Sequence, residues 1–85
     1  MEKNKIDIPT MTFVESSNIE SVGYHEEGRI LFINFKGKKG MPSRYFYKGV
    51  PKEIYSAFMA ADSRGSFLAK KIRPQYDCTK YKMTE

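Results

Sequence analysis

The 85-residue sequence has one cysteine, one histidine, no tryptophan and no long apolar run. Because an internal disulfide needs two cysteines, Cys78 cannot form one, which fits a reducing compartment. Apolar runs such as Ile30 to Ile33 are far too short to span a membrane, and no signal-peptide core follows the N-terminus. We therefore expect a cytoplasmic protein that has no membrane partner.

Residue sets typical of enzymes and metal sites are also missing. The single histidine, His25, lies beside two glutamates in an expected turn, where no partner positions it as a general base. Cys78 has no histidine near it in the sequence to activate its thiol. No Cys/His set has zinc spacing, and no glycine motif for phosphate or dinucleotide binding is present. We predict a protein that is not an enzyme and holds no metal or cofactor.

Apolar residues are nevertheless sufficient for a small core. They make up 40% of the chain and include six phenylalanines and six tyrosines, while the length suits one domain and is too short for two. The formal net charge is +5 and the pI is near 9.4. This basic balance is compatible with binding phosphates or an acidic protein surface, and equally with solubility alone.

Alternating apolar residues predict three strands in the first half of the chain, at residues 19–24, 29–36 and 44–48. The middle segment alternates most clearly and places three side chains on one face: Leu31, Ile33 and Phe35. Successive strands with short links favour an antiparallel meander.

The second half of the chain has the apolar spacing of two helices. Pro51 suits a first helical turn because its missing amide is not needed there. The first helix has its apolar stripe at Ile54, Ala57, Phe58 and Ala61. Ser63 is expected to cap the second helix, whose stripe comprises Phe67, Leu68 and Ile72 and which ends before Pro74.

Placing both helices on one face of the sheet is the simplest way to bury these stripes. We therefore predict an α+β domain in which a three-stranded antiparallel β-meander packs on two C-terminal helices. Residues 1–13 are expected to form an N-terminal arm, residues 14–76 the domain, and residues 77–85 a polar C-terminal tail.

The domain segment resembles the KTSC family, which is named for the C-terminal segment of some lysyl-tRNA synthetases and also occurs as a stand-alone protein in bacteria and phages. The motifs that carry the resemblance are Ser16-Ser17-Asn18-Ile19-Glu20-Ser21-Val22-Gly23-Tyr24, Leu31-x-Ile33-x-Phe35, Tyr45-Phe46-Tyr47, Val50-Pro51, Ala61-x-Ser63-x-Gly65-x-Phe67, Ile72-Arg73 and Tyr76. The resemblance implies the fold. The synthetase context adds an expectation of RNA binding.

Cationic and aromatic residues lie close together at two places in the sequence, which is typical of single-stranded RNA recognition. We predict a non-enzymatic module that binds RNA or another nucleic acid. Its expected binding residues are Lys38, Lys39, Arg44, Tyr45, Tyr47, Arg64, Lys70, Lys71, Arg73 and Tyr76.

These residues also have structural interpretations. Tyr45 and Tyr47 point to the same side of their strand and can pack on the helices with their hydroxyls at the rim. Lysines at a helix C-terminus complement its dipole without any ligand. Arg73 can bind a phosphate through two hydrogen bonds or pair with a carboxylate such as Glu53.

The alternative function is protein interaction, either as a homodimer or as a phage-type inhibitor of a host protein. If Leu31, Ile33 and Phe35 face the helices, the opposite sheet face carries Ile30, Phe32 and Phe46. Either the N-terminal arm covers this face with Ile6, Ile8 and Met11, or another chain does.

Overall fold

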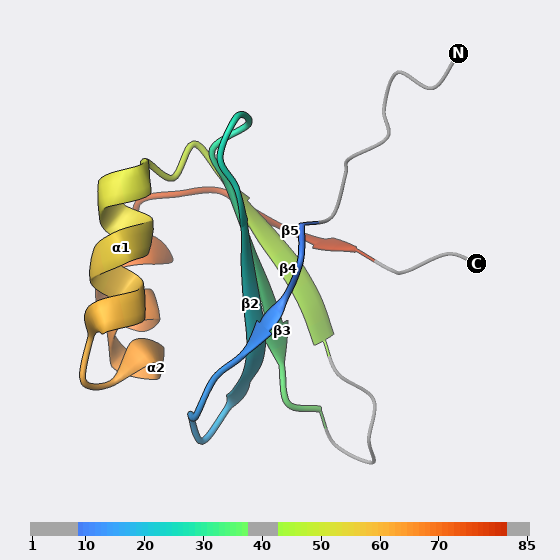
Figure 1. The fold of residues 1–85 in the computed structure, drawn as a ribbon, viewed down its shortest axis with the longest axis vertical. Coiled ribbons are helices and arrows are strands. Elements are labelled where there is room, and N and C mark those ends of the chain that lie inside the picture. Colours follow the sequence, from blue (N-terminus) through green and yellow to red (C-terminus); the bar gives the residue numbers. More distant parts are fainter. Residues whose placement is uncertain (1–8, 38–42, 82–85) are drawn as a thin grey trace.

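A computed structural model describes residues 9–37 and 43–81, which form one antiparallel sheet with two helical segments on one face (Figure 1). The α+β class predicted from the sequence is confirmed. The predicted three-stranded meander understates the sheet, which has five strands in the order β1-β2-β3-β4-β5. The strands are β1 (Thr12–Phe13), β2 (Ile19–His25), β3 (Ile30–Phe35), β4 (Ser43–Lys48) and β5 (Cys78–Tyr81).

The central strands form where apolar residues alternate. Val22 lies opposite Ile33, and Ile33 lies opposite Tyr45 on the next strand, so all three share the sheet face that packs against the helices. This register confirms that Leu31 and Ile33 face the helices, where both are fully buried. The meander therefore supplies the floor of the core.

Strand β5 lies within the segment predicted to be a polar tail. It pairs with β4 and places Cys78 opposite Tyr47. The Tyr81 ring packs edge-on against Phe32 at a centroid distance of 5.8 Å, so one aromatic residue anchors an otherwise exposed strand. A short edge strand of this kind lacks the apolar alternation that sequence reasoning needs.

The N-terminal arm folds back along the sheet edge as β1. Pro9 and Met11 lie over Gly23, where a Cβ atom would come within 2.5 Å of the Met11 Sδ atom and 3.2 Å of the Thr10 carbonyl oxygen. The glycine thus provides space for the arm to cross β2. Ile6 and Ile8, which were also expected to cover the sheet face opposite the helices, lie outside the described residues.

Helix α1 (Lys52–Ala60) begins one residue later than predicted. Pro51 has an extended backbone, with φ −66° and ψ 156°, and forms the N-cap, while its carbonyl oxygen accepts from the amide of Ile54. Glu53 lies in the first turn, where its charge complements the helix dipole. Phe58 is the fully buried residue that α1 contributes to the core.

The second helical segment contains α2 (Arg64–Phe67) and continues into the π-helical turn η2 (Leu68–Ile72). The Ser63 hydroxyl accepts a hydrogen bond from the Ser66 amide at 3.3 Å, which confirms the predicted cap. The Arg73 amide bonds the Leu68 carbonyl oxygen at 2.8 Å, five residues back, as a π-turn requires. Leu68 and Ile72 are thereby both buried against the sheet.

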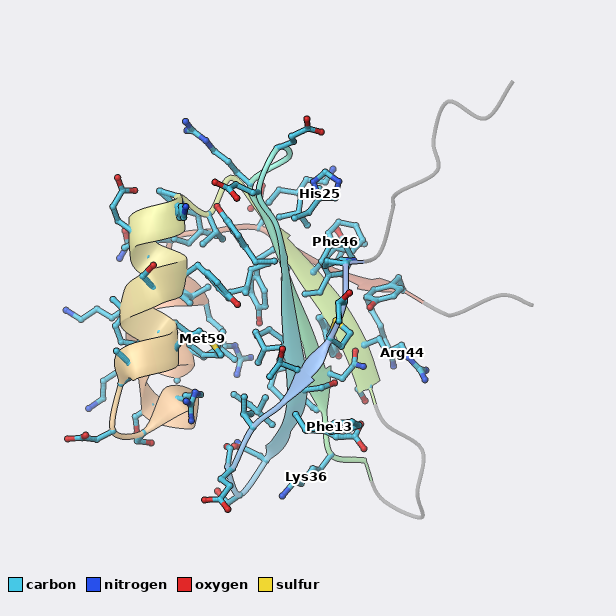
Figure 2. The ribbon with its side chains drawn as sticks, in the orientation of Figure 1. Phe13, His25, Lys36, Arg44, Phe46 and Met59 are labelled. Carbon is cyan, nitrogen blue, oxygen red and sulfur yellow. The ribbon has the colours of Figure 1, made fainter. Side chains whose placement is uncertain are left out.

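The two sheet faces differ in what covers them. Met59 points from α1 toward the sheet, while Phe13, Arg44 and Phe46 lie on the face away from the helices (Figure 2).

Among residues 9–37 and 43–81, no helix combines the length and apolar character needed to cross a membrane.

Candidate functional site

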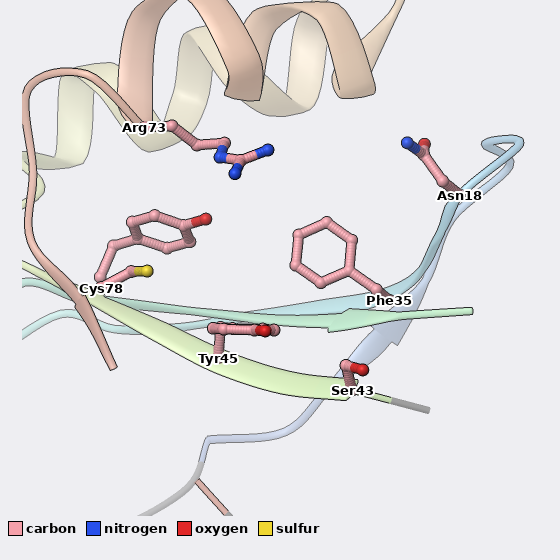
Figure 3. A pocket seen from close by; sticks show the side chains of 7 residues that line it. Asn18, Phe35, Ser43, Tyr45, Arg73 and Cys78 are labelled. Carbon is pink, nitrogen blue, oxygen red and sulfur yellow. The ribbon is translucent and has the colours of Figure 1, made fainter. Parts of the chain in front are cut away.

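A pocket of about 330 Å³ lies between the sheet and the C-terminal end of the second helical segment (Figure 3). Its walls come from parts of the chain that are distant in sequence. The lining residues are Asn18, Phe35, Ser43, Tyr45, Tyr47, Arg73 and Cys78.

The meander supplies most of the pocket floor. Ser43, Tyr45 and Tyr47 alternate along β4, so their side chains share the face that the helices cover. Phe35 on β3 lies opposite Ser43, and Cys78 on β5 lies opposite Tyr47. The register of the three strands thus places a hydroxyl, a thiol and aromatic rings side by side.

Tyr47 combines a buried ring with a hydroxyl at the pocket. Only 2% of the residue is exposed, and its hydroxyl has no oxygen or nitrogen partner among the described residues. Burial raises the pKa of the Tyr47 phenol to about 12, while the nearby Arg73 guanidinium partly opposes the shift. The neighbouring Cys78 thiol adds to the shift. At physiological pH the phenol is therefore neutral and available as a donor.

Tyr45 and Phe35 form the aromatic wall of the pocket. Their rings meet edge to face, with centroids 5.6 Å apart and an interplanar angle of 78°. Both residues are half-buried and pack against the margin of the core. The two rings therefore present aromatic surface to the pocket, and their packing against the core holds them in place.

Arg73 supplies the charge of the pocket. It is the C-cap of η2, its side chain is exposed, and its guanidinium reaches over the pocket in Figure 3. Within the described ranges, this guanidinium forms neither a salt bridge nor a hydrogen bond, so the alternative pairing with Glu53 is not made. None of the described lining residues is acidic. The pocket is consequently electropositive and rich in donors.

Asn18 closes the side opposite Arg73. The Ser16 hydroxyl donates to its Oδ1 atom at 3.2 Å, and Gly65 lies so near that a Cβ atom there would be 3.0 Å from the same oxygen. Figure 3 shows the amide directed toward the pocket. With Oδ1 held in this way, the Nδ2 group is the part of Asn18 left to bind a ligand.

The other described residues that were predicted to bind nucleic acid lie apart from this pocket. Arg44 is on the opposite sheet face (Figure 2), and Arg64 donates to the Met59 carbonyl oxygen at 2.8 Å. Lys70 and Lys71 are exposed on η2, and Tyr76 packs against the core. Lys38 and Lys39 lie outside the described residues.

Sequence reasoning did not select Asn18, Phe35, Ser43 or Cys78 as binding residues. Asn18 and Phe35 lie within motifs that carry the family resemblance, which was the available signal for them. Cys78 had no such signal because it belongs to a strand that the sequence did not reveal. In the part of the chain that the structure describes, His, Cys, Asp and Glu side chains form no group of three that could hold a metal ion.

The residues predicted for protein interaction have little free surface. Phe32 is 1% exposed and Phe46 is 7% exposed. The centroid of the Tyr81 ring lies 5.8 Å from that of Phe32 and 5.7 Å from that of Phe46. Ile30 is half-buried. Among the described residues, the large apolar side chain that does protrude is Phe13, which is 78% exposed on β1.

Comparison with known proteins agrees with this fold. The KTSC domain model matches residues 15–76. A solved KTSC domain protein from Yersinia pestis has a TM-score of 0.76 and 36% identity, covering 86% of this chain and 97% of its own.

Two curated relatives match over 63 residues, which is 74% of this chain. The protein from Tsukamurella paurometabola is 36% identical with 88% of its length covered, and an uncharacterized protein from Stutzerimonas stutzeri is 33% identical with 83% covered. The chain therefore belongs to the KTSC domain family.

Proposed function

We propose that this protein is a non-enzymatic binding module for single-stranded RNA or a related nucleic acid, and that it binds through the pocket at Arg73. The observation that carries the proposal is the convergence of Arg73, Tyr45 and Tyr47 around one cavity whose described lining contains no acidic residue. Phosphates need cationic donors, and bases need ring surface, so this combination matches both parts of a nucleotide chain.

Arg73 is the expected phosphate contact. Its guanidinium can give two parallel hydrogen bonds to one phosphate, and no described acidic group competes for it. Lys70 and Lys71 precede it on the same turn and are exposed, so they extend the positive potential along the surface. A strand of RNA would thus meet several cations as it approaches the pocket.

The test is an amide NMR titration with a short single-stranded RNA at low and high salt. We expect saturable shifts at Tyr45, Tyr47 and Arg73 that fade as salt rises, because bound phosphates release counterions. Arg73→Gln should weaken binding at least about tenfold, since a charge-assisted contact is lost.

Arg44→Gln is the matched control. It removes the same charge from the opposite sheet face, so its effect should be limited to the small change in long-range attraction. Equal losses in the two variants would show that net charge alone drives binding. Absence of any shift at low salt would refute the proposed function.

A protein-interaction role is the second candidate, and the exposed Phe13 ring favours it. β1 is a two-residue edge strand, and one side of an edge strand can accept another chain. Phe13→Ser should abolish self-association in sedimentation or size-exclusion experiments if a homodimer forms there. A wild-type chain that stays monomeric at high concentration would contradict the homodimer.

A further inference from the structure

The size of the pocket limits what it can hold. Its volume of about 330 Å³ is at the lower end of ordinary ligand sites, which span roughly 300 to 1,000 Å³. A run of stacked bases or a duplex edge does not fit such a space, whereas one nucleotide that has left its stack does. The volume of the cavity therefore favours a single unstacked nucleotide.

The polar groups of the pocket select for acceptors. Arg73 offers a cationic fork, Tyr47 a hydroxyl with no described oxygen or nitrogen partner, and Asn18 an amide whose oxygen is already engaged. No described lining residue carries a carboxylate that would repel an anion. A phosphate is the ligand group that accepts from several donors and also carries negative charge.

The aromatic wall selects for a flat ring beside the phosphate. Tyr45 and Phe35 hold each other edge to face, so their orientation is set before a ligand arrives. Tyr47 is nearly fully buried while its hydroxyl borders the same cavity, so one wall offers both apolar surface and a fixed donor. A nucleobase, which has a π-face and polar edges, uses both features.

We infer that the pocket is a mononucleotide site: one unpaired nucleotide enters with its phosphate on Arg73 and its base against the Tyr45 and Phe35 wall. This inference rests on the proposed function and goes further, because it makes a single nucleoside monophosphate a sufficient ligand. Tyr47 and Asn18 donate to the acceptors of the bound unit, and duplexes are excluded because their bases stay stacked.

The test uses the full chain and four probes: uridine 5′-monophosphate, uridine, ribose 5-phosphate and a short single-stranded RNA. Amide NMR follows binding of each probe, and competition against the labelled RNA measures displacement. We expect the monophosphate to displace the RNA and to bind about tenfold more tightly than ribose 5-phosphate, since base stacking on aromatic residues contributes at that level. Uridine should also bind more weakly than uridine 5′-monophosphate, because it lacks the phosphate that Arg73 binds.

A pair of variants separates the two halves of the site. Tyr45→Leu keeps apolar volume on β4 but removes the ring, so it should weaken the monophosphate about tenfold and leave ribose 5-phosphate unchanged. Arg73→Gln should weaken both phosphate-bearing probes, while Arg29→Gln, at an exposed position outside the described pocket lining, should leave both unchanged. Two-dimensional amide spectra of each variant confirm that it is folded.

The outcomes distinguish this inference from the proposed function. If the RNA binds in an Arg73-dependent manner but the monophosphate neither shifts the pocket nor displaces it, the mononucleotide site is refuted and RNA binding stands. If the monophosphate binds and the RNA does not, the site stands and the proposed function is wrong. Equal affinity for ribose 5-phosphate and the monophosphate would overturn the base contact and reduce the pocket to a phosphate site.

Discussion

Tyr47→Phe tests the assignment of the Tyr47 hydroxyl to ligand binding, because the variant removes that group and keeps the buried ring. Near neutral pH the free energy of unfolding should change by less than about 1 kcal/mol, since the hydroxyl loses only a weak contact with the Cys78 thiol. Affinity for the nucleotide should nevertheless fall, because a fixed donor leaves the pocket. If the hydroxyl instead stabilised the fold, the variant would lose more of its free energy of unfolding and would keep its affinity for the nucleotide.

At alkaline pH the same variant should be more stable than the wild type. The folded-state pKa of Tyr47 is raised from its ordinary value of 10.0 to about 12, so between these values the folded chain retains a proton that the unfolded chain releases. The wild type therefore loses stability as pH rises through this window, and the two-unit shift corresponds to roughly 2 to 3 kcal/mol. Below pH 10, Tyr47 is protonated in both the folded and the unfolded chain, so its full contribution to the stability of the wild type is present.

Urea unfolding of both proteins at a series of pH values from neutral to about 12 measures this difference. Phenolate absorbance in the same samples shows where the tyrosines ionise. The reasoning is refuted if the wild type and Tyr47→Phe lose stability in parallel above pH 10. A neutral-pH loss of more than about 2 kcal/mol would instead show that the hydroxyl stabilises the fold.

Three further predictions concern the fold. Phe58→Ala should lower the free energy of unfolding by about 3 to 5 kcal/mol in urea titrations, because Phe58 is fully buried in the core; a loss below 1 kcal/mol would contradict this packing. Gly23→Ala should displace the arm from β2 and cost about 1 to 3 kcal/mol. Faster exchange of the Val14 amide, which bonds the Glu20 carbonyl oxygen at 3.1 Å, would report the displacement, and unchanged exchange would exclude it. Lys52→Ala should change stability by less than about 0.5 kcal/mol, because its salt bridge to Glu26 is 66% and 68% exposed; a larger loss in thermal unfolding would contradict this.

The central strands and both helical segments follow from the sequence because their side chains obey a local rule. Residues on one face of β3 repeat every second position, and the stripe of α1 repeats at helical spacing. Ser63 as a cap and Pro74 as a helix end are local signals as well. Such features need no knowledge of what lies across the core.

The edge strands and the pocket depend on tertiary structure. β1 has two residues and β5 has four, so neither carries enough alternation to be recognised, and pairing with a neighbour determines both. Likewise, the sequence placed Tyr45 and Tyr47 on one face but left open which would be buried. In the folded chain Tyr47 joins the buried cluster that contains Leu68 and Ile72, whereas Tyr45 is only partly buried against it.

The sequence alone identified Arg73, Tyr45 and Tyr47 as candidate binding residues, within a longer set of cationic and aromatic side chains. Only the tertiary structure brought Asn18 and Cys78 into the same pocket, because those residues lie about sixty positions apart in the sequence and reach it through long-range strand pairing and helix packing. Local propensity acts over a few residues, whereas the shape of a pocket depends on contacts between distant segments.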